Sequence, residues 1–308
     1  EGSNMYAFIG FSVVLTILLR ISCAEDRASL DLKYQKWLLT YKAANPQHQN
    51  YCMNVLSGVR ERAASQFGQD MFMFFNIFKY WPMQGKKGFY VDSGANDARK
   101  LSNSFFFDVC LGWDGLCVEP MEMYHQEIRQ LRTCLLVPEC ISDKEETRSW
   151  VHATTGSRIQ NAGEKNPGQK VSTVKCMPLK NMLALSKDKN RNSIDLWSLD
   201  VEGHEITVLE STNFNDVKVS ALLVENSHIN QCKLDAVLWK RGFHKYEQLI
   251  IDGVYINNAT SVLNEGRENI WFHHGFHKEF AKERKLDVQR SIAHPDIFPP
   301  ENQKPCVY

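Results

Sequence analysis

"FYVDSGANDARK", residues 89–100, begins as a strand and ends as a turn of small and polar residues. The apolar and aromatic residues 89–91 are typical of a buried strand, which stops at Asp92 just before Gly94. A strand that ends in a carboxylate and a glycine is either an ordinary turn or the ligand-binding edge of an α/β sheet. The pattern of the surrounding chain decides between these two interpretations.

Strand patterns alternate with helix patterns along the middle of the chain. Strands are expected in "GFYVDSG" (88–94), "DGLCVEP" (114–120), "TCLLVPECISD" (133–143), "IDLWSLDVEG" (194–203) and "VSALLVENS" (219–227), and helices in "LSNSFFFDVCLG" (101–112), "MEMYHQEIRQLR" (121–132), "HEITVLEST" (204–212) and "CKLDAVLWKRG" (232–242). "FHKYEQLIIDGVYINN" (243–258) predicts a hairpin that turns at Asp252-Gly253. This order predicts an α/β fold: a doubly wound, mostly parallel sheet with helices on both faces and an antiparallel edge hairpin.

Segments outside this core complete the expected domain organisation. Two strands, around Trp150 and in "STVKCMPL" (172–179), flank a glycine-rich stretch at 152–170 that we expect to be exposed. Upstream, helical spacing of apolar residues predicts a helix that Pro46 closes. The expected division is a leader at 1–24, a helical stem or extension at 25–59, the main domain at 60–262 and a C-terminal extension at 263–308.

The N-terminal segment and the cysteines indicate the secretory pathway. We take Met5 as the natural start, and the apolar run 7–19, followed by small residues at 22–24, fits a cleaved signal peptide; a type II membrane anchor and a buried helix are the alternatives. Eight of the nine cysteines lie after this leader, and an even number predicts disulfides in an oxidising compartment. We therefore expect a protein of the endoplasmic reticulum or Golgi lumen, anchored or secreted. The 36 basic and 36 acidic residues cancel, so no strong field favours nucleic acid.

Acidic residues follow several of the predicted strands. Asp92, Glu119, Asp200 and Glu225 end four of them, and Asp143 lies just beyond another. Ligands of open α/β sheets bind outside the carboxyl ends of the strands, so these carboxylates favour a ligand rich in hydroxyl groups, amines or positive charge. One acidic strand end could simply cap the next helix. Neither a Walker loop nor Gly-x-Gly-x-x-Gly is present, which suits a nucleoside without phosphates, such as S-adenosylmethionine.

Four blocks in the same order resemble the FkbM-type methyltransferases. They are "SQFGQD" (65–70), "GFYVDSGANDARKLSNS" (88–104), "GWDGLCVEP" (112–120) and "IDLWSLDVEGHE" (194–205). The resemblance implies the class I methyltransferase fold, which is Rossmann-like, with S-adenosylmethionine as cofactor. It also implies methyl transfer to a hydroxyl group of a sugar or small metabolite. One departure is Ala98, where the family usually has glycine.

The same resemblance implies roles for individual residues. The residues implied to bind the cofactor are Asp92, Gly94 and Asn96 on the methionine side, Glu119 on the ribose, and Ser142 and Asp143 at the adenine amine. Asp200, Glu202 and His204 match the block beside the transferred methyl group, so His204 and Asp200 are the candidate bases. Glu202 could instead cap the following helix. We expect no metal, because the carboxylates that could ligate one already have this cofactor interpretation.

A second resemblance implies a different function. The apolar N-terminal segment, the scattered cysteines and this domain together resemble the animal Star proteins, which are trafficking factors in epidermal-growth-factor signalling. The alternative function is therefore a non-catalytic trafficking factor of the endoplasmic reticulum and Golgi that uses the fold as a binding module. The expected partners are a small-molecule or glycan acceptor, a cargo protein in the second interpretation, and a membrane if the leader is an anchor. The oligomeric state is left open.

Overall fold

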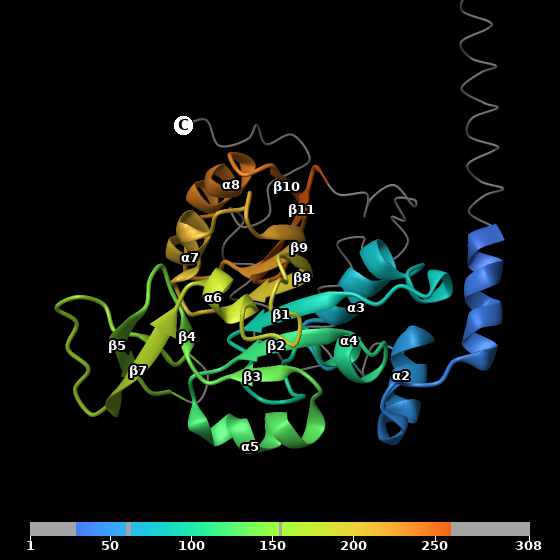
Figure 1. The fold of residues 1–308 in the computed structure, drawn as a ribbon, viewed down its shortest axis with the longest axis horizontal. Coiled ribbons are helices and arrows are strands. Elements are labelled where there is room, and N and C mark those ends of the chain that lie inside the picture. The colour runs from blue at the N-terminus through green and yellow to red at the C-terminus, as the bar shows by residue number, and fades with distance from the viewer. Residues whose placement is uncertain (1–28, 60–62, 154–155, 260–308) are drawn as a thin grey trace, which may run out of the picture.

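The computed structural model describes residues 29–59, 63–153 and 156–259, so the predicted leader and C-terminal extension lie outside it. Among the described residues, one sheet has seven strands in the order β10-β11-β9-β8-β1-β2-β3 (Figure 1). These strands are β1 (Phe89–Ser93), β2 (Asp114–Val118), β3 (Leu135–Val137), β8 (Ser193–Leu199), β9 (Lys218–Glu225), β10 (Phe243–Leu249) and β11 (Asp252–Asn257). All neighbouring pairs are parallel except those of β11, which runs antiparallel to both β9 and β10. The predicted mostly parallel sheet with an antiparallel edge hairpin is confirmed.

Alternate residues of the strands face two separate apolar cores. On β1, Tyr90 belongs to one core, whereas Phe89 and Val91 belong to the other. The first core is covered by a helix at 29–40, α2 (Gln49–Leu56), α3 (Gln69–Met73), the π-helical turn η3 (Phe74–Phe78), α4 (Phe105–Val109) and α5 (Glu122–Leu131). The second core is covered by α6 (Leu179–Leu183), α7 (Glu205–Ser211) and α8 (Gln231–Trp239). Helices therefore cover both faces, as predicted.

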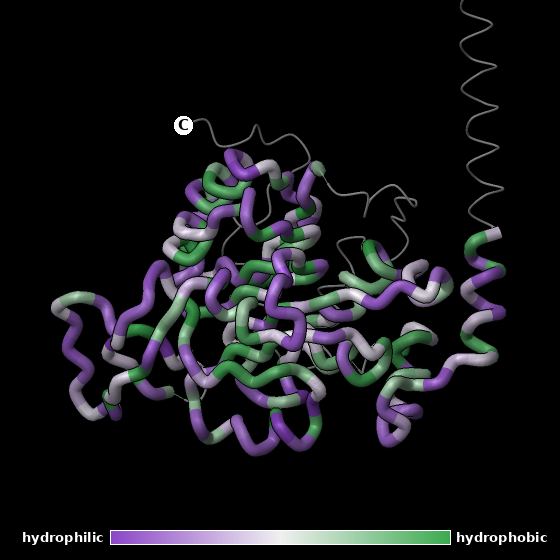
Figure 2. Tube along the Cα trace, viewed as in Figure 1, coloured by the Kyte–Doolittle hydropathy of each residue, from purple (hydrophilic) through white to green (hydrophobic). Residues whose placement is uncertain are grey.

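The helix α5 illustrates why these segments are helical. Its tube is largely hydrophilic in Figure 2, and the residues that it buries are His125 and Ile128. These two residues are three apart and therefore lie on one side of the helix, where Ile128 joins the first core.

Disulfides join segments that are far apart in the sequence. Cys52 of α2 is bonded to Cys110 at the end of α4, which ties the N-terminal extension to the sheet domain. Two further disulfides among the described residues are Cys117–Cys134 and Cys140–Cys176, and Cys232 is disulfide-bonded as well. Such cross-links are typical of extracellular and secretory-pathway proteins and agree with the predicted oxidising compartment. Within the described ranges, no helix combines the length and apolar character that a membrane crossing requires.

Two sequence predictions of strands and turns are wrong in detail. The expected single strand at 133–143 is two strands, because Pro138 interrupts it: β3 belongs to the large sheet and β4 (Cys140–Ile141) to a second one. The hairpin turns at residues 250–251 rather than at Asp252-Gly253, since Leu249 pairs with Asp252. Asp252 is the first residue of β11, where it is buried and accepts a 2.6 Å hydrogen bond from Nε2 of Gln69, a residue far away in the sequence.

The second sheet contains the strands that flank the glycine-rich stretch. Its order is β4-β7-β5-β6, with β5 (Glu146–Val151), β6 (Arg158–Ile159) and β7 (Val171–Met177). The predicted strands around Trp150 and at 172–179 are thus confirmed, and the disulfide between Cys140 and Cys176 joins the neighbouring strands β4 and β7. The sheet projects to one side of the large sheet in Figure 1.

A buried arginine holds the centre of the first core together. Arg132 follows α5, its side chain is fully buried, and its Nε lies 2.8 Å from Oδ2 of the equally buried Asp108 in α4. The guanidinium group also donates hydrogen bonds to Tyr90 Oη (3.0 Å), Ala98 O (3.2 Å), Ser102 Oγ (3.2 Å) and Ser104 Oγ (2.7 Å). Arg132 therefore joins β1, the turn that follows β1, and α4.

Replacing Arg132 with methionine should strongly destabilise the fold. The change leaves the Asp108 carboxylate buried without its cation, which costs about 3–5 kcal/mol. Urea denaturation should therefore show this loss in the free energy of unfolding. Arg129→Met, on the exposed side of the same helix, is the matched control and should change stability by no more than about 0.5 kcal/mol. A loss of less than about 1 kcal/mol for Arg132→Met would contradict the proposed importance of the ion pair.

Candidate functional site

The turn after β1 brings the ends of β1 and β8 into close contact. Gly94 has φ +84°, and a Cβ built on it would lie 1.8 Å from the backbone oxygen of Asp200. The backbone N–H of Asp200 in turn donates to Ser93 O at 3.0 Å. Glycine is therefore required at position 94 by the neighbouring strand end. The contact places Asp200 beside Gly94.

Glu119 is held in place by the backbone of two loops. Its carboxylate accepts hydrogen bonds from the N–H of Asn96 at Oε2 and from the N–H of Met121 at Oε1, both at 2.7 Å. Asn96 has φ 51°, a left-handed conformation that asparagine tolerates better than most residues. Burial raises the pKa of Glu119 to about 7, although these two hydrogen bonds act in the opposite direction.

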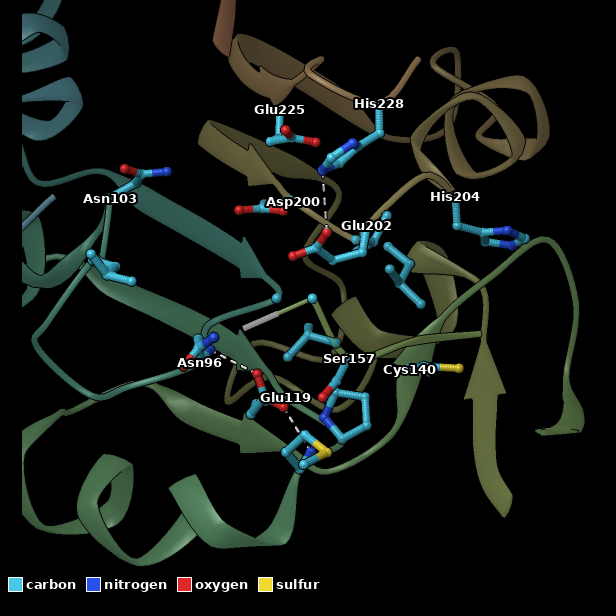
Figure 3. A pocket seen from close by; sticks show the side chains of 18 of the residues that line it. Asn96, Asn103, Glu119, Cys140, Ser157, Asp200, Glu202, His204, Glu225 and His228 are labelled. Carbon is cyan, nitrogen blue, oxygen red and sulfur yellow. Dashed lines mark hydrogen bonds and ion pairs between the residues drawn. The ribbon is translucent and has the colours of Figure 1, made fainter. Parts of the chain in front are cut away.

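A cavity of about 260 Å³ opens at the carboxyl ends of the strands (Figure 3). This volume is close to the lower end of small-ligand sites, about 300 Å³. The residues that line it from α3, the large sheet and the loops of that sheet include Gln69, Gly94, Asn96, Asn103, Glu119, Asp200, Glu202, His204, Glu225, Ser227, His228 and Asp252. The second sheet and its loop contribute Cys140, Ile141, Trp150, Gly156, Ser157 and Ile159. The cavity therefore lies between the two sheets.

Six of the nine predicted site residues line this cavity. They are Gly94, Asn96, Glu119, Asp200, Glu202 and His204, whereas Asp92, Ser142 and Asp143 are not part of the lining. Asp92 is buried behind the cavity, where its carboxylate accepts a hydrogen bond from Ser104 Oγ. Burial raises the pKa of Asp92, and the positive charge of Arg132 opposes this effect. The functional roles of all nine residues stay predictions.

The predicted catalytic residues do not converge on one point. β8 ends at Leu199, so Asp200 and Glu202 both lie in the loop that follows it. The ring of His204 points away from Asp200 in Figure 3, and its Nε2 lies 3.2 Å from Ser142 Oγ. Burial lowers the pKa of His204, which favours the neutral imidazole.

Asp200 instead belongs to a cluster of acidic residues. One carboxylate oxygen from each of Asp200, Glu205 and Glu225 lies within 4.8 Å of the others. At an effective dielectric constant of about 20, two unit charges at that separation repel by roughly 3–4 kcal/mol. Burial raises the pKa of Asp200 well above its usual range, and the negative charge of Glu225 raises it further. Burial also raises the pKa of Glu205 to about 7. Three full negative charges at this place therefore need compensation.

Sequence reasoning missed part of this cluster. Glu225 was visible as a strand end, but Glu205 had only its place at the close of the block 194–205 as a signal. Glu205 is the first residue of α7, and its Oε1 turns back to accept the N–H groups of Val201 (2.9 Å) and Gly203 (3.2 Å). This local hydrogen bonding brings the Glu205 carboxylate next to Asp200.

Asn103 is a further lining residue that the sequence did not indicate. Its Nδ2 donates to Ser198 Oγ at 3.1 Å, whereas its Oδ1 is buried without a hydrogen-bond partner. Buried polar atoms are rarely left unpaired, so this oxygen is available for a donor group of a ligand.

Comparison with known proteins identifies the central part of the chain. The family model of the methyltransferase FkbM domain matches residues 92–252, slightly more than half of the 308 residues. The match spans the strand ends that line the cavity. A comparison with curated proteins found no match, and the resemblance to the animal Star proteins stays a prediction.

The buried Glu119 should make stability depend on pH. Its pKa is about 7 in the folded protein, against 4.5 as the ordinary value, so the folded state binds more protons between these values. The free energy of unfolding contributed by Glu119 therefore falls as the pH rises from about 5 to about 8. Urea denaturation at several pH values should show that the free energy of unfolding falls less in Glu119→Gln than in wild type as the pH rises from about 5 to about 8. The difference between the two decreases should be on the order of 1–3 kcal/mol. Glu127→Gln, exposed on α5, should keep the wild-type pH dependence, and an equal dependence in both variants would contradict the prediction.

Proposed function

Because the chain belongs to the FkbM methyltransferase family, we propose that it transfers the methyl group of S-adenosylmethionine to a hydroxyl group of a sugar or small metabolite. The observation that carries this proposal is the cavity, which has Glu119 at the end of β2 and the acidic residues around Asp200 at the ends of β8 and β9. The strand order and the antiparallel β11 support the class I methyltransferase fold. Sheets of this type bind ligands at this edge.

The cavity residues fit S-adenosylmethionine in their chemistry. Glu119 offers carboxylate oxygens for the two hydroxyl groups of a ribose, and the unpaired Oδ1 of Asn103 can accept from the ammonium group of the methionine part. The acidic residues on the other side favour a ligand with positive charge. When bound, this cofactor supplies a methyl group on a positively charged sulfur.

The acceptor hydroxyl must lose its proton to a base in the cavity. We propose Asp200, because Gly94 and Ser93 fix its backbone at the floor of the cavity. Its raised pKa makes the ionised form a stronger base than an ordinary aspartate. His204 is the alternative base, and its contact with Ser142 would first have to change for the ring to turn towards Asp200.

The second sheet is the proposed acceptor side. Gly156, Ser157 and Ile159 line the cavity and come from the glycine-rich stretch. The disulfides support a location in the secretory pathway, and we propose the lumen of the endoplasmic reticulum or Golgi, where glycans and small metabolites are available as acceptors.

Loss of the Glu119 carboxylate should weaken cofactor binding. Calorimetry with S-adenosylmethionine should show that Glu119→Ala binds about 1–3 kcal/mol more weakly, the range expected for hydrogen bonds to a charged group. Glu127→Ala, exposed on α5, should bind as wild type does. Unchanged affinity in Glu119→Ala would remove this residue from the cofactor site.

Methyl transfer should depend on Asp200. With labelled S-adenosylmethionine and an extract of glycans and metabolites, wild type should label an acceptor, and Asp200→Asn should be slower by about 10²–10⁴-fold, as expected for loss of a general base. His204→Gln should retain most of the activity, and the reverse order of the two variants would make His204 the base. If wild type binds the cofactor but labels nothing, the domain is better explained as a binding module for a cargo protein.

A further inference from the structure

We propose that Asp200, Glu205 and Glu225 form a binding site for one divalent metal ion, at a place where the sequence led us to expect none. One oxygen from each carboxylate lies within 4.8 Å of the other two. Oxygen atoms bound to one Ca²⁺ at 2.3–2.6 Å are separated by at most about 5 Å, and those bound to one Mg²⁺ by at most about 4.2 Å. Three oxygens within 4.8 Å of one another lie at most about 2.8 Å from a common point, so a shift of a few tenths of an ångström lets one Ca²⁺ contact all three carboxylates, whereas Mg²⁺ requires a larger shift.

Two of these carboxylates have an oxygen without a partner. Glu205 is 0% exposed and Glu225 is 4% exposed, and the Oε2 atoms of both are buried with no hydrogen bond. Their Oε1 atoms, in contrast, accept hydrogen bonds: Glu205 from the loop before α7, and Glu225 from the N–H of Ser227 at 3.1 Å. Each side chain is thus held by one oxygen, while its second oxygen is buried without a partner; metal-binding side chains are oriented by hydrogen bonds of this kind.

Among the described residues, neither lysine nor arginine is found beside the cluster in the cavity. The charged groups that face the cluster are Glu202, Asp252 and His228, and His228 lies 3.8 Å from the Glu202 carboxylate. The donor atoms are all carboxylate oxygens, which favours the hard ions Mg²⁺, Mn²⁺ and Ca²⁺ over ions that prefer nitrogen or sulfur ligands.

The site would also explain how Asp200 can act in the proposed reaction. Each carboxylate contributes one oxygen to the ion, so the second oxygen of Asp200 stays available to accept the proton of the acceptor hydroxyl. The ion would keep the carboxylates ionised, which lowers the pKa of Asp200, and would polarise the acceptor hydroxyl group so that a weaker base is sufficient to take its proton. This role in catalysis rests on the proposed function, whereas the binding of the ion rests only on the geometry of the three carboxylates.

The test is a titration with Mn²⁺ alone. The full chain, with its disulfides intact, is treated with a chelator, dialysed and titrated without S-adenosylmethionine, and free Mn²⁺ is measured by electron paramagnetic resonance. We expect one Mn²⁺ per chain, displaced by Mg²⁺ or Ca²⁺, and an affinity at least about tenfold lower in Glu225→Gln and in Glu205→Gln. Glu119→Gln is the matched control, because it removes another buried carboxylate of the same cavity and should leave the affinity for Mn²⁺ unchanged.

The possible outcomes separate this site from the proposed function. Circular dichroism checks that each variant is folded, and Asp200→Asn replaces Glu205→Gln if loss of the hydrogen bonds to the loop before α7 unfolds the latter. The proposed metal site is wrong if wild type binds no Mn²⁺, or if wild type and folded Glu225→Gln bind Mn²⁺ equally tightly. In that case the carboxylates are stabilised by shared protons and not by a metal ion. Methyl transfer by a protein that binds no Mn²⁺ counts against the metal site but not against the proposed enzyme. Mn²⁺ binding without methyl transfer supports the site and counts against the proposed enzyme.

Discussion

The buried ion pair between Arg132 and Asp108 is the interaction on which the cavity depends. The guanidinium group of Arg132 connects β1 at Tyr90 with the turn at Ala98 and with α4. A buried pair of this kind adds little net stability, but removal of one partner is costly. The pair therefore fixes the conformation of the turn, and with it the position of Asn96, whose N–H binds Glu119.

Asp92 in β1 and Asp200 just after β8 differ in how their charges are compensated. Asp92 lies in the field of Arg132, and its carboxylate accepts a hydrogen bond from Ser104. At the ends of β8 and β9, Asp200 has only acidic neighbours among the groups that shift its pKa. The charge of Asp92 is thus compensated within the protein, whereas the residues around Asp200 carry an excess of negative charge. This difference is the physical reason to look for a cationic ligand at Asp200 and not at Asp92.

The sequence predicted the features that depend on local pattern. Period-two and helical spacing of apolar residues identified most strands and helices, and the alternation of the two implied the doubly wound sheet. The sequence could not predict contacts between residues that are far apart along the chain. Examples are the hydrogen bond between Gln69 and Asp252 and the ion pair between Arg132 and Asp108. For the same reason Glu119 and Asp200 could be named as strand-end acids, while Glu205 could not, because its side chain turns back from a helix.

The contact between Gly94 and Asp200 affects how sequences related to this one should be compared. Any side chain at position 94 would collide with the backbone of Asp200, so selection for folding alone is enough to preserve this glycine. A relative that has lost catalysis would be expected to retain it. The carboxylate of Asp200 is under no such requirement, because the collision involves its backbone oxygen and not its side chain. With Asp200 as the proposed base, variation at position 200 would therefore distinguish active from inactive members among related chains, and an invariant glycine would not.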